Sequence, residues 1–141
     1  MAKLLLISIN PIYAKTIYEG SKRIELRGSL PKKLHGHKAF IYETAPVSKI
    51  TGWIRIGGFI QMRKDEFWRR FGLMTGITED EFFNYFSGMV DAHGIYIDSA
   101  HHLKIPFSLK DFKLNKPPHS WRYINYHPYI DDDLFLLTLT L

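Results

Sequence analysis

The sequence contains no cysteine, no long apolar run and no glycine-rich phosphate loop. The lack of cysteine excludes disulfide bridges, thiolate catalysis and zinc sites built on thiolates. The apolar segment Leu4–Ile9 is shorter than a signal-peptide core, and nothing approaches the ~20 apolar residues that span a bilayer. We therefore expect a cytoplasmic protein without a membrane partner. Because no Gly-x-Gly-x-x-Gly pattern is present, nucleotide-dependent chemistry is not expected.

What the chain has in excess is positive charge in one half, together with aromatic residues. Residues 1–70 hold 14 Lys and Arg against 5 Asp and Glu, a net +9, whereas residues 71–141 carry a net −4. Basic surfaces attract polyanions, and the aromatic share of 15% supplies rings on which bases can stack. The composition favours a nucleic-acid partner, although small proteins can also be basic for solubility alone.

The order of predicted elements is that of one α+β domain covering residues 1–141. Asn10 and Pro11 are typical of a helix start and Gly20 of a helix end, so an early helix is expected between them. The longest strand is expected to bend at Gly57 and Gly58, as suits a small closed barrel. Apolar and alternating patterns predict strands at residues 3–9, 23–27, 39–43, 51–62, 93–99, 101–106 and 134–141.

A helical insertion is expected to interrupt the strands at about residues 65–90. Its second helix begins at the capping box Thr78-x-x-Glu81. Aromatic residues at helical spacing indicate packing between these helices and the rest of the domain. They are Phe67, Trp68, Phe82, Phe83 and Phe86. A large exposed aromatic patch here would instead favour a protein-interaction domain.

Residues 20–27, Gly-Ser-Lys-Arg-Ile-Glu-Leu-Arg, place several charged side chains at one turn-to-strand junction. Gly20 allows a turn that brings Lys22 to the barrel rim, while Glu25 and Arg27 share a strand face and can pair. Arg27 can bind a phosphate or a base edge, and Glu25 can accept a hydrogen bond from a base amino group. On spacing alone, the favoured interpretation is that Arg23, Glu25 and Arg27 form a solvated strand face with weak ion pairs.

The spacing Gly-x-Lys-x-x-Glu-x-Arg resembles the signature of the ASCH family, a branch of the PUA-like β-barrels. Three further segments, Ser8–Tyr13, Thr51–Ile56 and Pro118–Tyr123, resemble the family at corresponding places. The resemblance implies a PUA-like small mixed β-barrel with an early helix and a mid-chain helical insertion. It also implies a cleft near the Lys22–Arg27 motif that binds RNA or another nucleic acid. Some members are proposed regulators of transcription or translation. A few relatives are enzymes, among them an N4-acetylcytidine amidohydrolase and a proposed ribonuclease.

This chain departs from the amidohydrolase pattern, Lys-x-x-Thr-x-Arg, because Glu25 stands at the threonine position. Glu25 is expected to hold Lys22 protonated, which weakens Lys22 as a catalytic base. The alternative function is therefore a hydrolase of a nucleoside or RNA, with Lys22 and a carboxylate, Glu25 or Glu43, as catalysts.

Other candidate contacts lie outside the motif. Trp121 after a Pro-Pro loop and Tyr42 are the predicted stacking residues, with Arg122 beside Trp121. The cations expected to add sequence-independent attraction to phosphates are Lys32, Lys33 and Lys38. The seven histidines have no zinc-site spacing, so neither a metal nor another cofactor is expected.

The sequence thus predicts a nucleic-acid-binding module, with RNA as the favoured partner, rather than an enzyme. Lys22 and Arg27 are expected to contact the ligand, Glu25 to read a donor or orient Arg27, and Gly20 to shape the cleft.

Overall fold

The computed structural model describes residues 3–31, 38–125 and 133–140. The strands are β1 (Lys3–Ile9), β2 (Ile24–Leu26), β3 (Lys38–Glu43), β4 (Lys49–Arg63), β5 (Asp91–Phe107) and β6 (Trp121–Asn125). The helices are α1 (Pro11–Glu19), α2 (Lys64–Phe71), α3 (Glu79–Tyr85) and α4 (Asp133–Thr138), with 3₁₀ turns η1 (Gly72–Met74) and η2 (Leu109–Phe112). No helix within these residues is long and apolar enough to cross a membrane.

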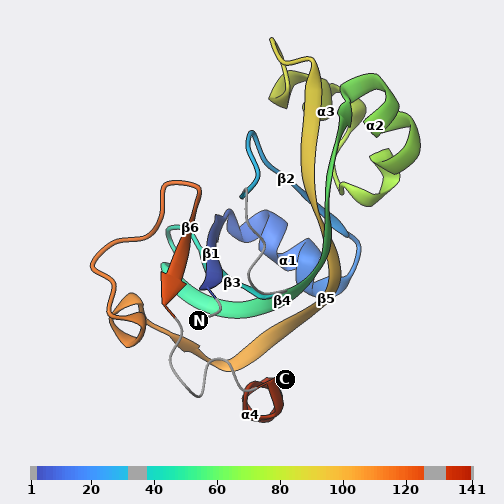
Figure 1. Cartoon of the computed structure of the whole chain (residues 1–141). Helices are drawn as coiled ribbons and strands as arrows, with labels where there is room; N and C mark the ends of the chain where they lie inside the picture. The colour runs from blue at the N-terminus through green and yellow to red at the C-terminus, as the bar shows by residue number, and fades with distance from the viewer. Residues whose placement is uncertain (1–2, 32–37, 126–132, 141) are drawn as a thin grey trace.

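All six strands form one mixed sheet in the order β2-β5-β4-β3-β1-β6. Only β1 and β3 pair in parallel, and the other neighbours are antiparallel. The sheet curves around α1 (Figure 1). The described residues do not form the predicted closed barrel, because no pairing joins the edge strands β2 and β6. Instead the Arg27 side chain, just after β2, donates a hydrogen bond to Ser120, just before β6. A side chain thus spans the gap that a sixth ladder would close.

The two longest strands, β4 and β5, form a bent hairpin that runs the length of the molecule. Their register shifts between Arg55 and Ile56 and again between Ile56 and Gly58, which confirms the irregularity predicted at the glycine pair. The prediction of two separate strands at 93–99 and 101–106 was wrong. Both belong to β5, since the pairing with β4 continues through Ser99–His101.

Local capping signals act as predicted. The Asn10 side chain accepts a hydrogen bond from the Ile12 amide at the start of α1. Gly20 ends α1 with φ 89°, a left-handed conformation that glycine adopts without strain. Thr78 and Glu81 form the expected capping box of α3. The two ends of α1 and the start of α3 are therefore set by short-range hydrogen bonds.

Two apolar cores lie on opposite faces of the sheet, and a third fills its far end. The first core packs α1 against the sheet through residues such as Ile17 and Ile54. The second, on the other face, includes Tyr42 and Trp53 and is covered by η2 and α4. The third packs the helical insertion against the far ends of β4 and β5, with the side chain of Phe67 fully buried.

The predicted insertion at 65–90 is confirmed as α2, η1 and α3. Its aromatic rings pack inward as expected: Phe67, Phe82 and Phe86 are buried, and Trp68 and Phe83 pack partly buried beside them. The large exposed aromatic patch that would have favoured a protein-interaction domain is thus absent from this described segment. The charged motif lies beneath these helices.

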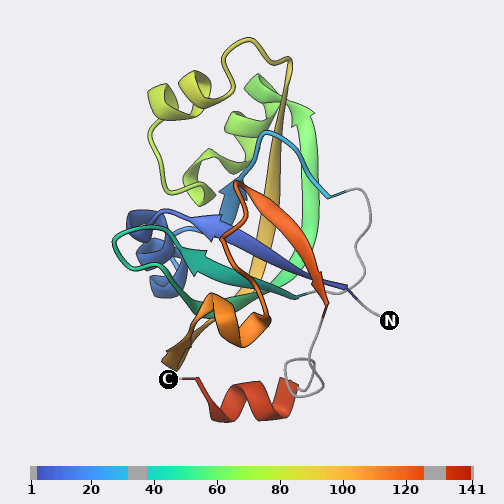
Figure 2. The same cartoon turned by 90° about the vertical axis from the view of Figure 1, so that its left-hand side faces the viewer.

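The C-terminal strand predicted at 134–141 was wrong, because the described part of this segment forms the helix α4 (Figure 2). A short leucine-rich run suits a buried strand or one helix face equally well. Here Leu136 is the buried residue of the helix, while Leu134 and Leu137 are exposed. Over residues 133–140, the bridge between Leu103 and Thr140 is the one β-bridge to the sheet.

Candidate functional site

The charged motif is buried, although its residue types are those of a surface. Lys22 is 2% exposed, Glu25 5% and Arg27 9%. The interpretation of this face as a solvated one is therefore wrong, and so is the expectation that Lys22 emerges at a rim. Charged side chains are rarely buried unless they are paired, so each of these three needs partners.

The partners of Lys22 come from the first helix, from β2 and from the helical insertion. Its ammonium donates to the carbonyl oxygen of Thr75, forms an ion pair with Glu25 (Nζ–Oε1 3.8 Å) and lies 5.2 Å from the centre of the Tyr13 ring. Gly76 follows Thr75, and a Cβ added there would come within 3.2 Å of the Lys22 Cβ. The turn between η1 and α3 thus closes over the lysine.

The electrostatics of Lys22 differ from the expectation. Burial lowers the pKa of Lys22 from its usual 10.5, and this effect outweighs the attraction of Glu25, which acts in the opposite direction. The positive charge of Arg27 lowers the pKa further. Glu25 raises the pKa of Lys22, as predicted, but it does not dominate, because the opposing effect of burial is larger and was not visible in the sequence.

The lowered pKa predicts a pH-dependent contribution of Lys22 to stability. Between its folded-state pKa and 10.5, the unfolded chain retains a proton that the folded chain has released, so stability rises with pH across this window. We expect the free energy of unfolding of the wild type, relative to Lys22→Met, to increase from neutral pH towards about 10.5. Urea unfolding of both proteins at a series of pH values measures this difference, and a flat or falling difference would contradict the assignment.

Glu25 and Arg27 pair side by side as predicted, with Arg27 Nη2 at 3.3 Å from Glu25 Oε2. Arg27 also donates to the Ser8 carbonyl oxygen (2.8 Å) and to Ser120 Oγ (3.0 Å). Its Nε is buried without a hydrogen-bond partner among the described residues. Arg27 thus ties β1 and the start of β6 to β2, while Glu25 lies between two cations.

A small pocket of about 100 Å³ opens onto this charged cluster. Its polar floor is Lys22 and Glu25, and two aromatic residues, Tyr13 and Tyr85, contribute to its walls. Tyr85 is 52% exposed, so it reaches the solvent at the mouth. The full lining is Tyr13, Lys22, Glu25, Leu26, Ile77, Glu81 and Tyr85. We call it the motif pocket.

The motif pocket combines a donor, an acceptor and flat aromatic walls. A closed engineered cavity of about 150 Å³ holds benzene; this pocket is smaller, about 100 Å³, but open, so it suits one six-membered ring partly inserted through its mouth. Lys22 and Glu25 line the same pocket and supply a donor and an acceptor. The geometry suits an unpaired base better than a phosphate, because Glu25 and Glu81 both repel anions.

Several predicted contact residues are not brought to the motif pocket. Tyr42 is 5% exposed and belongs to the core on the opposite face of the sheet, so it cannot stack on a ligand here. Lys38 is buried near the Trp53 ring rather than on the surface. Lys32 and Lys33 lie outside the described residues.

The segment around β6 adjoins the motif through Ser120 instead of through its aromatic rings. Trp121 is half-buried and packs edge-to-face on Tyr123, with ring centres 5.5 Å apart. Arg122 is exposed, and its Nε donates to the Tyr123 carbonyl oxygen. Contact of these side chains with a ligand stays a prediction.

The sequence did not indicate Thr75, Glu81 or Tyr85 as site residues. All three are brought to Lys22 or its pocket by the helical insertion, more than fifty positions along the chain. The only signal that could have pointed to this site was Tyr85, an exposed ring at the end of α3 beside rings that pack inward.

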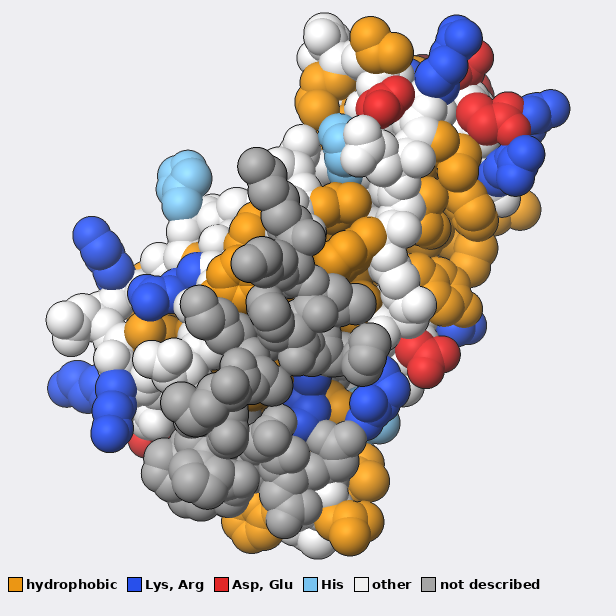
Figure 3. Space-filling model, in the orientation of Figure 1, with side chains coloured by type: hydrophobic (Ala, Val, Ile, Leu, Met, Phe, Trp, Pro, Cys, Tyr) orange, Lys and Arg blue, Asp and Glu red, His pale blue; other side chains and the backbone are white. Residues whose placement is uncertain are grey.

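On the face shown in Figure 3, the Lys and Arg side chains of the described residues lie at several separate places, including the end that carries α2. There Arg69 and Arg70 pair with Glu66. No group of three or more His, Asp or Glu residues that could hold a metal occurs in the described part of the chain.

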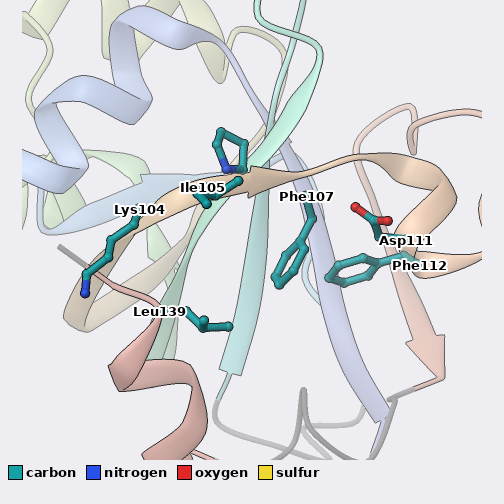
Figure 4. Close-up of a pocket in the computed structure, with 7 residues that line it drawn as sticks. Lys104, Ile105, Phe107, Asp111, Phe112 and Leu139 are labelled. Atoms are coloured by element: carbon teal, nitrogen blue, oxygen red, sulfur yellow. The ribbon is translucent and has the colours of Figure 1, made fainter.

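A separate apolar hollow of about 370 Å³ lies at the other end of β5 (Figure 4). Phe107 and Phe112 contact each other there, and Leu139 faces them from the segment after α4. It carries few polar groups and shares no residue with the motif pocket.

The chain resembles proteins from Zymomonas mobilis over most of its length, although no family model matches it. The ASCH domain-containing ribonuclease of that organism is 27% identical over 122 residues, or 84% of this chain and 82% of that protein. The crystal structure of its ASCH protein with a serine-to-alanine change superposes with a TM-score of 0.79, 25% identity and coverage of 99% and 98% of the two chains. The crystal structure of ASCH from the same organism gives 0.79 at 24% identity, with coverage of 100% and 98%.

Proposed function

Because this chain is an ASCH domain with a buried charged cluster beneath an aromatic pocket, we propose that it binds single-stranded RNA by inserting one unpaired base into the motif pocket. The observation that carries the proposal is the placement of Lys22 and Glu25 on the floor between Tyr13 and Tyr85. Sequence-specific RNA recognition uses such features: splayed bases stack on aromatic rings and bond polar groups along their edges.

The chemistry of the floor selects a base edge that carries both a donor and an acceptor. Lys22 donates and Glu25 accepts. Duplex bases are already paired along that edge, so single strands are the expected ligand. The name of the Zymomonas relative, a ribonuclease, supports RNA over DNA.

The test is a titration of fluorescein-labelled RNA, DNA and duplex hexamers by anisotropy at several salt concentrations. Single-stranded RNA is expected to bind most tightly, with an affinity that falls as salt rises. Equal binding of duplex and single strands would contradict insertion of a base, and no binding of any RNA would overturn the proposal.

Tyr85 provides a variant that acts at the pocket mouth. We expect Tyr85→Ala to weaken RNA binding about tenfold, because loss of one stacked ring costs on the order of 1–3 kcal/mol. Tyr85→Phe keeps the ring and is the matched control, which should bind like the wild type. If Tyr85→Ala also binds like the wild type, the base does not enter between the two tyrosines.

RNA cleavage is a second candidate, favoured by the relative's name and by the lowered pKa of Lys22. A lysine whose pKa is lowered by burial is a better proton acceptor than a solvated one. In cleavage by the neighbouring 2′-hydroxyl, the neutral Lys22 amine would accept the hydroxyl proton as the 2′-oxygen attacks phosphorus. The 5′-oxygen would leave with a proton from water, which gives a 2′,3′-cyclic phosphate and a 5′-hydroxyl. The titrated hexamers, run afterwards on a denaturing gel, distinguish the two: shortened products support the nuclease, and intact RNA supports a reader acting on transcription or translation.

A further inference from the structure

A larger hollow, of about 540 Å³, lies beside α1. It is lined by Lys15, Tyr18, Glu19, Glu43, Ala100, His101 and His102. None of these residues lines the motif pocket. We call it the histidine pocket. Its composition differs from that of a core defect, because six of its seven lining residues carry a titratable group or a hydroxyl.

The histidine pocket contains a preformed ring platform. The His102 ring stacks on the Tyr18 ring, with centres 4.4 Å apart and planes 11° from parallel. Tyr18 is itself fixed, since its hydroxyl lies 2.8 Å from Thr51 Oγ1. Gly52 permits this approach, because an added Cβ would come within 2.4 Å of the Tyr18 hydroxyl. His102 is exposed, so the ring held on one side by Tyr18 is accessible on the surface.

A carboxylate stands at the same pocket without a partner of its own. Glu43 ends β3 and is half-buried, and its carboxylate makes no hydrogen bond or ion pair within the described part of the chain. The other acidic residue of the pocket, Glu19, is 3.9 Å from the Lys15 ammonium. Two carboxylates repel phosphate, so the pocket suits the donor edge of a neutral base rather than the backbone.

A further hollow, of about 230 Å³, has lining residues in common with both pockets. This hollow shares Tyr18 and Ala100 with the histidine pocket and Lys22 with the motif pocket. Gly20, whose missing side chain leaves open space, lies along it. A strand with one base in the motif pocket therefore has a path along α1 to the histidine pocket.

We propose that the histidine pocket is a second RNA subsite that takes a guanine base, stacked on His102 with its edge on Glu43. The proposal rests on the proposed function, because it assigns a neighbouring base of the same strand. Guanine presents two adjacent donors, N1–H and the N2 amino group, which match the two oxygens of one carboxylate. Cytosine and adenine each present a single amino group, and uracil a single ring N–H.

The test scans guanine along a uridine hexamer and measures each affinity by anisotropy. We expect one position to bind about tenfold more tightly than the all-uridine hexamer, consistent with the gain from a bidentate base contact. Replacing that guanine by inosine, which lacks the N2 amino group, should remove most of the gain. Glu43→Gln should abolish the preference and His102→Ala should weaken the preferred hexamer to the level of the all-uridine one. Glu79→Gln, an exposed α3 residue that lines none of these pockets, is the charge-matched control and should keep the preference.

The outcomes separate this subsite from the proposed function. RNA binding without any guanine preference, or a preference that survives in Glu43→Gln, overturns the subsite and leaves base insertion at the motif pocket intact. Absence of RNA binding by the wild type overturns both. Thermal unfolding of each variant, followed by circular dichroism, shows whether an affinity change comes from the site or from loss of the fold.

Discussion

Glu25→Ala is expected to lose about 3–5 kcal/mol of unfolding free energy, the largest stability effect of any single change in the site. The carboxylate lies between Lys22 and Arg27, and all three side chains are buried. Removing it leaves two neighbouring cations in a low-dielectric interior without a counter-charge. Urea unfolding at pH 7 measures the loss, which would leave little of the 5–15 kcal/mol that stabilises a typical domain.

Two comparisons isolate the electrostatic cause. Glu25→Gln keeps the side-chain volume and should still be strongly destabilised, whereas Lys22→Met in that background should restore part of the stability by removing one uncompensated cation. Glu66→Ala is the surface control: Glu66 also pairs with two arginines, Arg69 and Arg70, but in solvent, so its loss should be far smaller. If Glu25→Ala costs no more than Glu66→Ala, the buried network does not hold the fold together.

Local chemistry explains which parts of the structure the sequence predicted. Asn10, Gly20 and the Thr78–Glu81 box act within a few residues, so their hydrogen bonds follow from spacing alone. The pairing of Glu25 with Arg27 is equally local, since alternate residues of a strand share a face.

The burial of Lys22 could not be predicted in this way. Its enclosure depends on the carbonyl of Thr75 and on helix α3, which reach it only after the insertion packs on the sheet. The same holds for Tyr42, whose side of the sheet is set by the whole strand order and not by its own segment. The prediction for the C-terminal segment failed for a different reason. A few leucines fit a strand or a helix equally well, and the burial of Leu136 against the core is what favours the helix.

The curvature of the sheet brings the locally determined strand motif together with the helical insertion that packs on it. The bent β4–β5 hairpin carries the insertion above the motif, and Arg27 joins the strand edges beneath it. The family resemblance predicted a barrel, whereas the structure has an open sheet whose two edge strands are linked by the hydrogen bond between Arg27 and Ser120. The site therefore exists only in the folded chain, and stability and RNA binding share the residues Lys22, Glu25 and Arg27.

Lys22→Met is expected to separate these two roles. Methionine is unbranched and fits a space shaped for the lysine stem. The change removes a buried charge, but Glu25 stays paired with Arg27, so we expect little loss of stability. The same change removes the only cationic donor that lines the motif pocket among the described residues. We therefore expect the unfolding free energy to stay near the wild-type value while the affinity for single-stranded RNA falls about 10- to 100-fold, the range for a lost charged hydrogen bond.

The measurement is anisotropy with labelled RNA hexamers beside urea unfolding of the same preparations. Lys110→Met makes the same charge change at an exposed position outside every pocket described above, so it should shift only the salt dependence. If the hexamers are cut, their cleavage should fall by two or more orders of magnitude in Lys22→Met, since general-base catalysis contributes about 10²–10⁴. A stable Lys22→Met protein that binds RNA as tightly as the wild type would remove Lys22 from the site. The base would then be held by the tyrosines alone, and the buried cluster would serve only the fold.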